Sequence, residues 1–497
     1  MVIQRQRAVV ALFLLQLLAV AAHRAPMVNA QCNPGGGLGG VGADIVVGDL
    51  VDVSTQGIAG GYRAYSLETV LCNIGTAAIG WVANSSQHPI WTLNLYRLES
   101  NRYEQIAHSW VRHGFFPLQQ NTCGCGCIPS AGVSLGVGCS TVNSAGTNGH
   151  QESFAARSDV IDAHLAIHPG LAVLAPPIVD VTSRRLRVLE ADLDPTLHPG
   201  ARYFLELMVL APDDAAAGNN ANNASYIELQ VLPGGSLGTL GTTQRQRLGI
   251  EAWASADPAV QQVEIADPDG ARLVLAASVR DNANGTWTYE YAVQNLDSTD
   301  GLERFALPIV GGAQVIGTDF HGLEQHSGEI YDDVPWVATI TPGSEVAWEI
   351  APGSTNALRW GSLFNFSVTA NAPPGPITAT LGWFAPGFPN DGQVLTMGPV
   401  GGGVTFVRGD CGGEGSTNIA DAVLLLGALF PPPGLPSVLS CPSACDANDD
   451  GALNIADVVA LLGSLFGSPT VPLSPPLACG VDPNQDGLSC TSFPACP

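Results

Sequence analysis

Residues 272–297 read RLVLAASVRDNANGTWTYEYAVQNLD. Two largely apolar runs flank an Asn-Gly turn, which is the pattern of two strands separated by a turn. Runs of the same kind extend over residues 245–403 and are separated by Asp-Gly, Asn-Gly and Pro-Gly turns about every eight to twelve residues. This spacing predicts a β-sandwich domain over residues 245–403.

The preceding block, residues 31–240, is also rich in short strand-like runs. Several of them alternate apolar and polar side chains, among them ARYFLELMVLAP from Ala201 and SYIELQVL from Ser225. Alternation with a period of two is typical of a strand with one buried face. The predicted fold class is therefore mainly β, with two β-rich, sandwich-like domains.

The charge balance excludes several classes of function. The chain has 497 residues, 44 of them acidic and 19 basic, all arginine, which gives a net charge of -25. A surface this acidic repels nucleic acid and anionic membranes. The absence of lysine excludes imine chemistry and the lysine-dependent handling of nucleotide phosphates.

The N-terminus predicts export. Residues 1–30 carry Arg5 and Arg7, then an apolar run over residues 8–22, then small residues before Gln31. This is the pattern of a cleaved secretory signal, and the apolar run is short for a membrane span of about 20 residues. We therefore expect a secreted or cell-surface protein with no membrane span after cleavage.

The twelve cysteines divide evenly between the two ends of the chain. Six lie before residue 140, six lie after residue 410, and none lies between. In an exported chain this distribution predicts two separate disulfide frameworks around a cysteine-free domain, with the pairing within each framework left open.

Residues 404–497 contain an internal repeat. GDCGGEGSTNIADAVLLLGALF begins at Gly409, and CDANDDGALNIADVVALLGSLF begins at Cys445, 36 residues later. Each copy is a glycine-centred acidic loop that leads into an apolar helix. A duplicated loop-helix unit is the most specific signal in the chain.

The second loop fits the twelve-position template of an EF-hand-type calcium loop. A calcium ion takes six to eight oxygen ligands, which alternate residues of a tight loop provide around a glycine turn. The predicted ligands of this loop are Asp446, Asn448, Asp450, the carbonyl of Ala452, Asn454 and Asp457.

The first loop fits the template less well. Its predicted ligands are Asp410, Glu414, Asn418 and Asp421. Position 3 is Gly412, which has no side chain, and Glu414 at position 5 is one methylene longer than aspartate, so we expect weaker binding. A third acidic stretch, DPNQDG from Asp482, lacks a ligand at position 12, and a disulfide-tethered turn between Cys479 and Cys490 is the preferred interpretation.

The paired loops resemble a type I dockerin module, in the form found on secreted proteins of planctomycete-type bacteria. The resemblance covers residues 404–497 and implies calcium-dependent folding and attachment to a cohesin-like or cell-surface partner in polysaccharide-degrading assemblies. Dockerins usually carry Ser or Thr at loop positions 10 and 11, where this chain has Ile419, Ala420, Ile455 and Ala456. The two preceding domains resemble uncharacterised secreted bacterial β-rich domains, through FHGLEQHSGEIYDD and SSQHPIWTLNLYRL.

Three polar clusters in the β-rich domains are further candidate sites. His88, His108 and His113 precede Cys123, Cys125 and Cys127, but in an oxidising compartment disulfides are favoured over a metal. The acids and amides between Asp213 and Asn223 could bind calcium or sugar, although a solvated loop is favoured. The third cluster comprises Asp319, His321, Glu324, His326, Glu329, Asp332 and Asp333. These residues could perform glycoside hydrolysis or bind a metal, but a polar loop of the sandwich is the favoured interpretation.

These features together predict a secreted multidomain protein with a calcium-binding, dockerin-like tail for extracellular attachment, without catalytic activity of its own. The alternative is a secreted carbohydrate-active enzyme that acts on a polysaccharide and is carried by a dockerin, with its site in the third cluster or in the histidine stretch.

Overall fold

The computed structural model describes residues 39–497 with short gaps. The gaps are residues 115, 171–177, 327, 385–390, 402–403, 432–438, 468–471, 481, 483–487, 489, 491 and 497. The predicted signal segment, residues 1–30, and most of the acidic stretch after Asp482 therefore lie outside the described residues. In the described part of the chain, no helix is both long enough and apolar enough to cross a bilayer.

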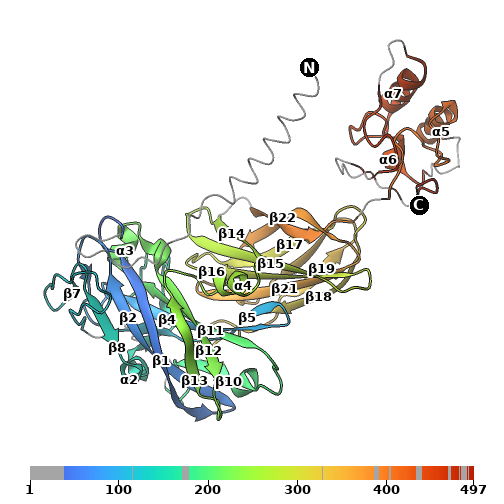
Figure 1. Cartoon of the computed structure of the whole chain (residues 1–497). Coiled ribbons are helices and arrows are strands. Elements are labelled where there is room, and N and C mark those ends of the chain that lie inside the picture. Colours follow the sequence, from blue (N-terminus) through green and yellow to red (C-terminus); the bar gives the residue numbers. More distant parts are fainter. Residues whose placement is uncertain are drawn as a thin grey trace.

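An N-terminal sandwich of antiparallel sheets comes first (Figure 1). Its strands are β1 Ile45–Ala59, β2 Tyr62–Asn73, β3 Ile79–Gly80, β4 Ile90–Glu99, β5 Arg102–His108, β6 Val111–His113, β7 Ser134–Leu135, β8 Ser140–Asn143, β9 Phe154–Ala155, β10 Leu186–Leu189, β11 Arg202–Leu210, β12 Ala224–Val231 and β13 Leu237–Gln244. Short helices lie between them: α2 Ala145–Asn148, η1 Gln151–Ser153, η2 Arg157–Asp159, η3 Glu190–Leu193, α3 Pro212–Ala216 and η4 Asn220–Asn222.

The two main sheets of this sandwich enclose one apolar core. The four-stranded sheet has the order β1-β2-β10, with β8 also paired to β2. The seven-stranded sheet has the order β13-β12-β11-β4-β6-β9, with β5 also paired to β4. Leu71 and Tyr65 from the first sheet pack against Leu95 and Leu205 from the second, and all four side chains are buried.

A second sandwich follows, from the region in which the sequence predicts one. Its elements are α4 Glu251–Ala256, β14 Gln261–Ala266, β15 Arg272–Asp281, β16 Trp287–Asn295, β17 Leu302–Pro308, β18 Val315–His321, β19 Val337–Thr341, β20 Glu345–Glu349, β21 Ser362–Ala370, β22 Pro374–Trp383 and β23 Gly392–Pro399. The two five-stranded sheets have the orders β14-β15-β16-β21-β18 and β19-β20-β17-β22-β23. Their core is rich in aromatic rings in contact, for example Phe305 and Phe366 with ring centroids 4.6 Å apart.

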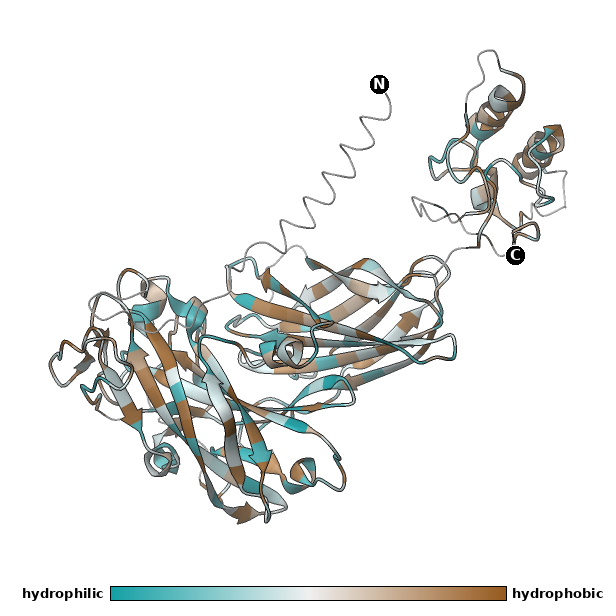
Figure 2. Ribbon diagram, in the orientation of Figure 1, coloured by the Kyte–Doolittle hydropathy of each residue, from teal (hydrophilic) through white to brown (hydrophobic). Residues whose placement is uncertain are grey.

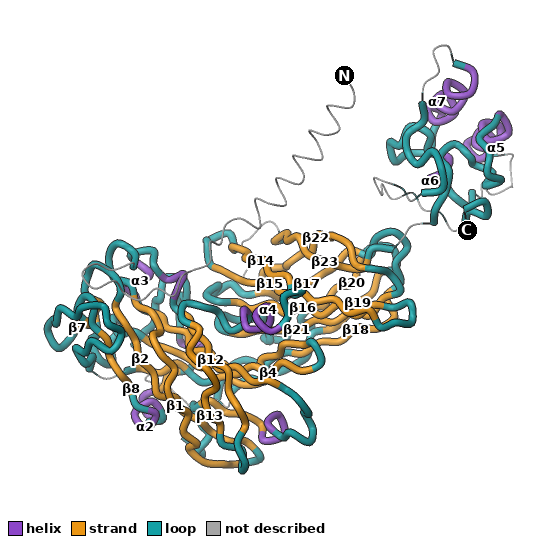
Figure 3. The backbone as a smooth tube through the Cα atoms, viewed as in Figure 1, coloured by secondary structure: helices purple, strands orange, loops and turns teal. Residues whose placement is uncertain are grey.

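The two strand-like runs of residues 272–297 are β15 and β16, which form an antiparallel hairpin in register from Leu273 opposite Asn295 to Asp281 opposite Trp287. Gly285 closes its turn at φ +80°, a conformation that glycine adopts without steric cost. The prediction of a mainly β fold is confirmed, and Figure 3 shows how little of the chain is helical.

The two sandwiches share a further core. The outward face of β11 and the outward face of β15 are both apolar, and Phe204, Tyr103 and Trp253 lie between them. The rings of Tyr103 and Trp253 are stacked with centroids 6.3 Å apart. Strands such as β11 are therefore buried on both faces. Figure 2 shows brown, hydrophobic segments on strands of both sandwiches, with teal on many of the loops.

A buried polar network crosses the same interface. The Glu206 carboxylate is fully buried and accepts hydrogen bonds from the Tyr96 hydroxyl (2.6 Å), the Asn94 amide (2.8 Å) and the backbone N–H of Gly249 (2.6 Å). Gln294 of the second sandwich donates to both carboxylate oxygens (3.2 and 3.1 Å). A buried carboxylate satisfied from both sides makes the separation of the two sandwiches costly.

The C-terminal module, from Val404 onward, is helical and stands apart from the sandwiches in Figure 1. Its helices are α5 Ile419–Leu429, α6 Pro442–Cys445 and α7 Ile455–Phe466. Leu425 of α5 and Leu461 of α7 are fully buried in the core between them. Asn418 and Asn454 cap the two helices, each paired in a capping box with the aspartate three residues later.

Disulfides join cysteines within each of the two predicted sets. The described bonds are Cys72–Cys123, Cys127–Cys139, Cys411–Cys445, Cys441–Cys490 and Cys479–Cys496. Cys479 and Cys490 therefore bond elsewhere rather than to each other. Five disulfides are typical of a protein that folds in an oxidising compartment outside the cytoplasm.

Candidate metal centre

The first acidic loop of the C-terminal module is organised around Asp410, whose side chain is buried. Its carboxylate accepts hydrogen bonds from the backbone N–H groups of Gly413 (2.9 Å), Glu414 (3.2 Å) and Gly415 (2.6 Å). Asp421, in the first turn of α5, accepts from the backbone of Gly412 (3.0 Å). The loop therefore wraps its backbone donors around two buried carboxylates.

Three carboxylates gather in this loop. One oxygen each from Asp410, Glu414 and Asp421 lies within 4.8 Å of the others. A side chain at Gly412 would overlap the carboxylate of Glu414, so the longer glutamate fills the space that the missing side chain at position 3 leaves. Asn418 is also present, and its amide donates to Glu414 (2.9 Å). The two departures from the template that the sequence shows thus compensate each other.

The second loop has the same backbone arrangement. The buried carboxylate of Asp446 accepts from the N–H groups of Asp449 (3.0 Å), Asp450 (3.2 Å) and Gly451 (3.0 Å). Asp457, in the first turn of α7, accepts from the backbone of Asn454 (2.9 Å). The equivalence of the two loops extends from sequence to hydrogen bonding, as expected for a duplicated unit.

The predicted amide ligands of the second loop contact the other predicted ligands. Asn448 donates to the Asp450 carboxylate (2.8 Å), and Asn454 donates to the carbonyl of Ala452 (2.8 Å). All six predicted ligands therefore lie in one connected group. Rotation of an asparagine amide exchanges its nitrogen for its oxygen, so Asn448 can offer an oxygen ligand without a change of backbone.

Each loop contains a carboxylate whose pKa is raised by burial and by its acidic neighbours. Burial raises the pKa of Asp457 above its usual value, and the neighbouring Asp446 carboxylate raises it further. Burial also raises the pKa of Asp410, with Glu414 and Asp421 adding to the effect. Carboxylates held together in this way bind a hard divalent cation readily, because the cation relieves their repulsion.

Arg408, which the sequence analysis did not single out, pairs with two acids of the module that are not predicted ligands of the repeated loops. Its side chain is fully buried and forms ion pairs with Asp449 (2.6 Å) and Asp482 (2.9 Å), neither of which is a predicted ligand in the two repeated loops. It also donates to the backbone carbonyl of Asp446 (2.6 Å). The detectable signal is that Arg408 is the only basic residue in residues 404–497, against nine acids. The predicted ligand carboxylates are left without a basic partner among the described residues.

The two helices carry matching exposed apolar residues. Ile419, Val423 and Phe430 of the first unit and Ile455, Val459 and Phe466 of the second are all more than half exposed. Each residue of the first set lies 36 positions before its counterpart in the second. These side chains are available for contact with another molecule.

The acidic cluster of residues 319–333 contacts the N-terminal sandwich. Glu329 accepts from the backbone N–H groups of Arg157 (2.7 Å) and Ser158 (3.3 Å), and Glu324 forms an ion pair with Arg187 (2.8 Å). Asp319 pairs with Arg102 (2.5 Å), His321 contacts the carbonyl of Gln105 (3.3 Å), and His326 contacts that of Arg185 (2.7 Å). Asp332 accepts from Ser354 (2.6 Å), and Asp333 accepts from the backbone of Gln325 (2.5 Å). The contacts of Glu324, His326 and Glu329 hold the connection between β18 and β19 against the neighbouring sandwich, whereas those of Asp332 and Asp333 lie within the second sandwich.

The histidines of the first block separate into two buried groups. His113 lies between His88 and His168, with ring centroids 5.9 and 5.4 Å away, whereas His108 lies beside His326 at 5.8 Å. Burial is the main cause that lowers the pKa of His113 to about 3. Cys123 and Cys127 form disulfides with Cys72 and Cys139, and Cys125 is also disulfide-bonded, so these thiols are not metal ligands.

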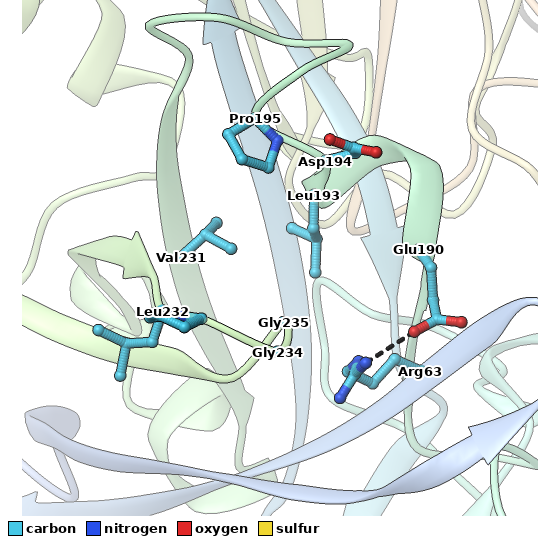
Figure 4. Close-up of a pocket in the computed structure, with 10 residues that line it drawn as sticks. Arg63, Glu190, Leu193, Asp194, Pro195, Val231, Leu232, Gly234 and Gly235 are labelled. Carbon is cyan, nitrogen blue, oxygen red and sulfur yellow. Dashed lines mark hydrogen bonds and ion pairs between the residues drawn. The ribbon is translucent and has the colours of Figure 1, made fainter.

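An open cavity of about 540 Å³ lies between η3 and the β12–β13 turn (Figure 4). Arg63 and Glu190 form an ion pair of 2.7 Å on one side of it, and Leu193 and Val231 face it with apolar side chains. The sequence reading did not single out these residues.

Comparisons with known proteins identify no family. No family model and no curated protein matches the chain. Two solved structures with some similarity are the serine-rich repeat adhesion glycoprotein of Streptococcus agalactiae and the N-terminal domain of an adhesin of Streptococcus gordonii. Each is 9% identical with a TM-score of 0.18; the first covers 66% of this chain and 87% of its own, the second 72% and 94%. At TM-scores this low, neither similarity bears on function.

Proposed function

We propose that this protein is an exported attachment protein whose dockerin-like, C-terminal module binds calcium in its two loops and docks onto a partner protein outside the cell. The two joined sandwiches form the body that the module attaches. The observation that carries the proposal is the duplicated exposed apolar set on α5 and α7, directly after the two acidic loops. An exposed apolar set that is repeated with its loop indicates a docking function.

The net charge of the module indicates what kind of partner surface it can bind. With one arginine and nine acids, its net charge is -8, and two bound calcium ions would reduce this to -4. Because Arg408 is buried, the module offers no basic side chain at its surface. We therefore expect a partner face that is apolar at its centre and neutral or basic at its rim, as in a cohesin-like or cell-surface protein.

Calcium dependence supplies the first test. Calorimetric titration of the EDTA-treated full-length protein is expected to show calcium binding that Asp410→Asn removes from the first loop and Asp446→Asn from the second. If the double variant showed as many calcium-binding events as the wild type, the calcium assignment of the module would be refuted.

Attachment supplies the second test. The full-length protein, immobilised, should retain a secreted protein of its source organism in millimolar calcium and release it in EDTA. Val423→Ser combined with Val459→Ser should abolish retention, whereas Val337→Ser, an equally exposed valine on β19, should leave it unchanged. Retention that survives both EDTA and the double variant would exclude the module as the docking surface.

A further inference from the structure

The start of β1 brings together two buried carboxylates that lie far apart in the sequence. Asp44 immediately precedes β1 and is 1% exposed, and Asp214 belongs to α3 and is 0% exposed. Asp214 accepts from the backbone N–H of Ile45 (2.8 Å), the residue after Asp44. The two acids therefore occupy one buried position at the end of the N-terminal sandwich.

The described residues offer these carboxylates only neutral donors. Asp44 accepts from the backbone of Gly40 (2.5 Å) and from the Asn222 amide (3.1 Å). Asp214 accepts from Ile45 and from the Asn223 amide (2.8 Å). Two buried carboxylates without a cationic partner are expensive to keep ionised, because neutral hydrogen bonds replace only part of the lost hydration.

The two asparagines provide an independent observation. The Oδ1 atoms of Asn222 and Asn223 are both buried and have no hydrogen-bond partner, although the amide nitrogens of the same side chains contact the carboxylates. Asn223 as a whole is 7% exposed. Unpaired buried amide oxygens are rare in proteins and often indicate an ion or water that belongs to the site.

We propose that Asp44, Asp214, Asn222 and Asn223 form a calcium site in the N-terminal sandwich, separate from the two loops of the C-terminal module. All four side chains carry the hard oxygens that calcium prefers. If each asparagine amide rotates by half a turn, its oxygen takes the place of its nitrogen. The carboxylate oxygen that now accepts from that nitrogen then becomes free to bind a cation. The cation then binds both carboxylates and both amide oxygens, with water completing its shell.

The surrounding backbone is closely packed around these residues. A side chain at Gly75 would overlap the backbone of Gly42 and Asp44, so the β2–β3 turn lies directly against the site. The amide of Asn219 donates to the carbonyl of Ala43 (2.7 Å), which ties the start of β1 to the loop between α3 and η4. A cation here would fasten the first strand to the opposite sheet.

Calcium fits this site better than magnesium. Magnesium keeps several of its waters in a strict octahedral shell, whereas calcium accepts irregular sets of carboxylate and amide oxygens. The exported location that the disulfides indicate also exposes the site to extracellular calcium.

The test uses the full-length chain with both loops of the C-terminal module silenced by Asp410→Asn and Asp446→Asn. Calorimetric titration with calcium is expected to show one remaining binding event, which Asp44→Asn or Asp214→Asn abolishes and an equal concentration of magnesium does not reproduce. The absence of calcium binding in the silenced chain, or binding that survives both aspartate variants, would overturn the proposal. Either result leaves the calcium assignment of the C-terminal module untouched, because that is tested on its own variants.

A variant of Asn223 tests the site even if the aspartate variants fold poorly. Asn223→Asp adds a carboxylate with nearly the same shape, so it should increase calcium affinity at least tenfold and enlarge the difference between the melting temperatures of the sandwiches in calcium and in EDTA. An unchanged difference would contradict a cation at this position.

Discussion

A disulfide between Cys411 and Cys445 joins the residue that follows Asp410 to the residue that precedes Asp446. The first predicted ligands of the two loops are therefore held next to one covalent link. We therefore expect the geometries of the two loops to be coupled through this bond.

Removal of this disulfide by Cys411→Ser and Cys445→Ser should destabilise the C-terminal module and weaken calcium binding at both loops. The bond closes a segment of 34 residues, for which loop-closure entropy predicts a loss of roughly 3–4 kcal/mol. Scanning calorimetry and calcium titration measure the two effects. Cys479→Ser with Cys496→Ser is the control, because that bond lies outside both loops; an equal loss of calcium affinity in the control would contradict a special role for the first bond.

Glu414→Asp should weaken calcium binding at the first loop by about tenfold, or about 1.4 kcal/mol. The shorter side chain no longer fills the space beside Gly412. Adding Gly412→Asn to Glu414→Asp should restore the affinity, because it recreates the ligand spacing of the second loop. Calcium titration of the wild type, Glu414→Asp, Gly412→Asn and the double variant gives the coupling between the two positions, and strictly additive effects would show that they do not compensate each other.

Acid should destabilise the sandwiches through their buried histidines. The pKa of His113 is lowered to about 3 in the folded chain, mainly by burial and also by His168, His88 and Arg112. Between about pH 6.5 and 3 the unfolded chain binds a proton at this residue and the folded chain does not, so stability falls as the pH falls, by up to about 1.4 kcal/mol per pH unit.

Urea unfolding at pH 7 and pH 5 measures this dependence. His113→Phe should reduce the difference in unfolding free energy between the two pH values. His150→Phe is the matched control, since His150 is exposed and should leave the difference unchanged. The same pH dependence in wild type and His113→Phe would count against the prediction.

Arg157→Met should destabilise the joined sandwiches by about 2–5 kcal/mol. The buried guanidinium donates to the carbonyl of Ser109 (2.9 Å) and the hydroxyl of Thr92 (2.6 Å), and across the interface to the carbonyl of Gly361 (2.9 Å). The substitution removes the donor from all three acceptors, and of these the carbonyl of Ser109 still accepts from the Thr92 hydroxyl (3.0 Å). Tryptophan fluorescence during urea unfolding reports the loss, and Arg280→Met, at an exposed position, should cost less than 0.5 kcal/mol.

The sequence allowed prediction of those features that depend on local patterns. Strands β15 and β16 follow from two apolar runs around an Asn-Gly turn, and the mainly β class follows from repeated turn spacing. The spacing of the candidate ligands alone identifies the two acidic loops as EF-hand-type loops. Calcium binding by these loops remains a prediction.

Long-range relationships could not be read in the same way. Phe204 and Tyr103 look like ordinary strand residues, and nothing local indicates that a second sandwich covers them. Asp44 and Asp214 are separated by 170 positions, so only the folded chain brings them together. Gly412 and Glu414 are each unfavourable for calcium binding when compared with the template. Only the path of the folded loop shows that the Glu414 carboxylate occupies the space beside Gly412.

The placement of arginine has a consequence for proteolysis. The chain has no lysine, and among the arginines of the described residues only Arg202, Arg245 and Arg280 are exposed. Arg202 and Arg280 lie within paired strands, so within the described part of the chain the turn after β13, which holds Arg245 and the comparably exposed side chain of Arg247, is the most accessible site for trypsin. A single cut there would give two fragments on a denaturing gel that still migrate together in native form, because the core shared by the two sandwiches holds them.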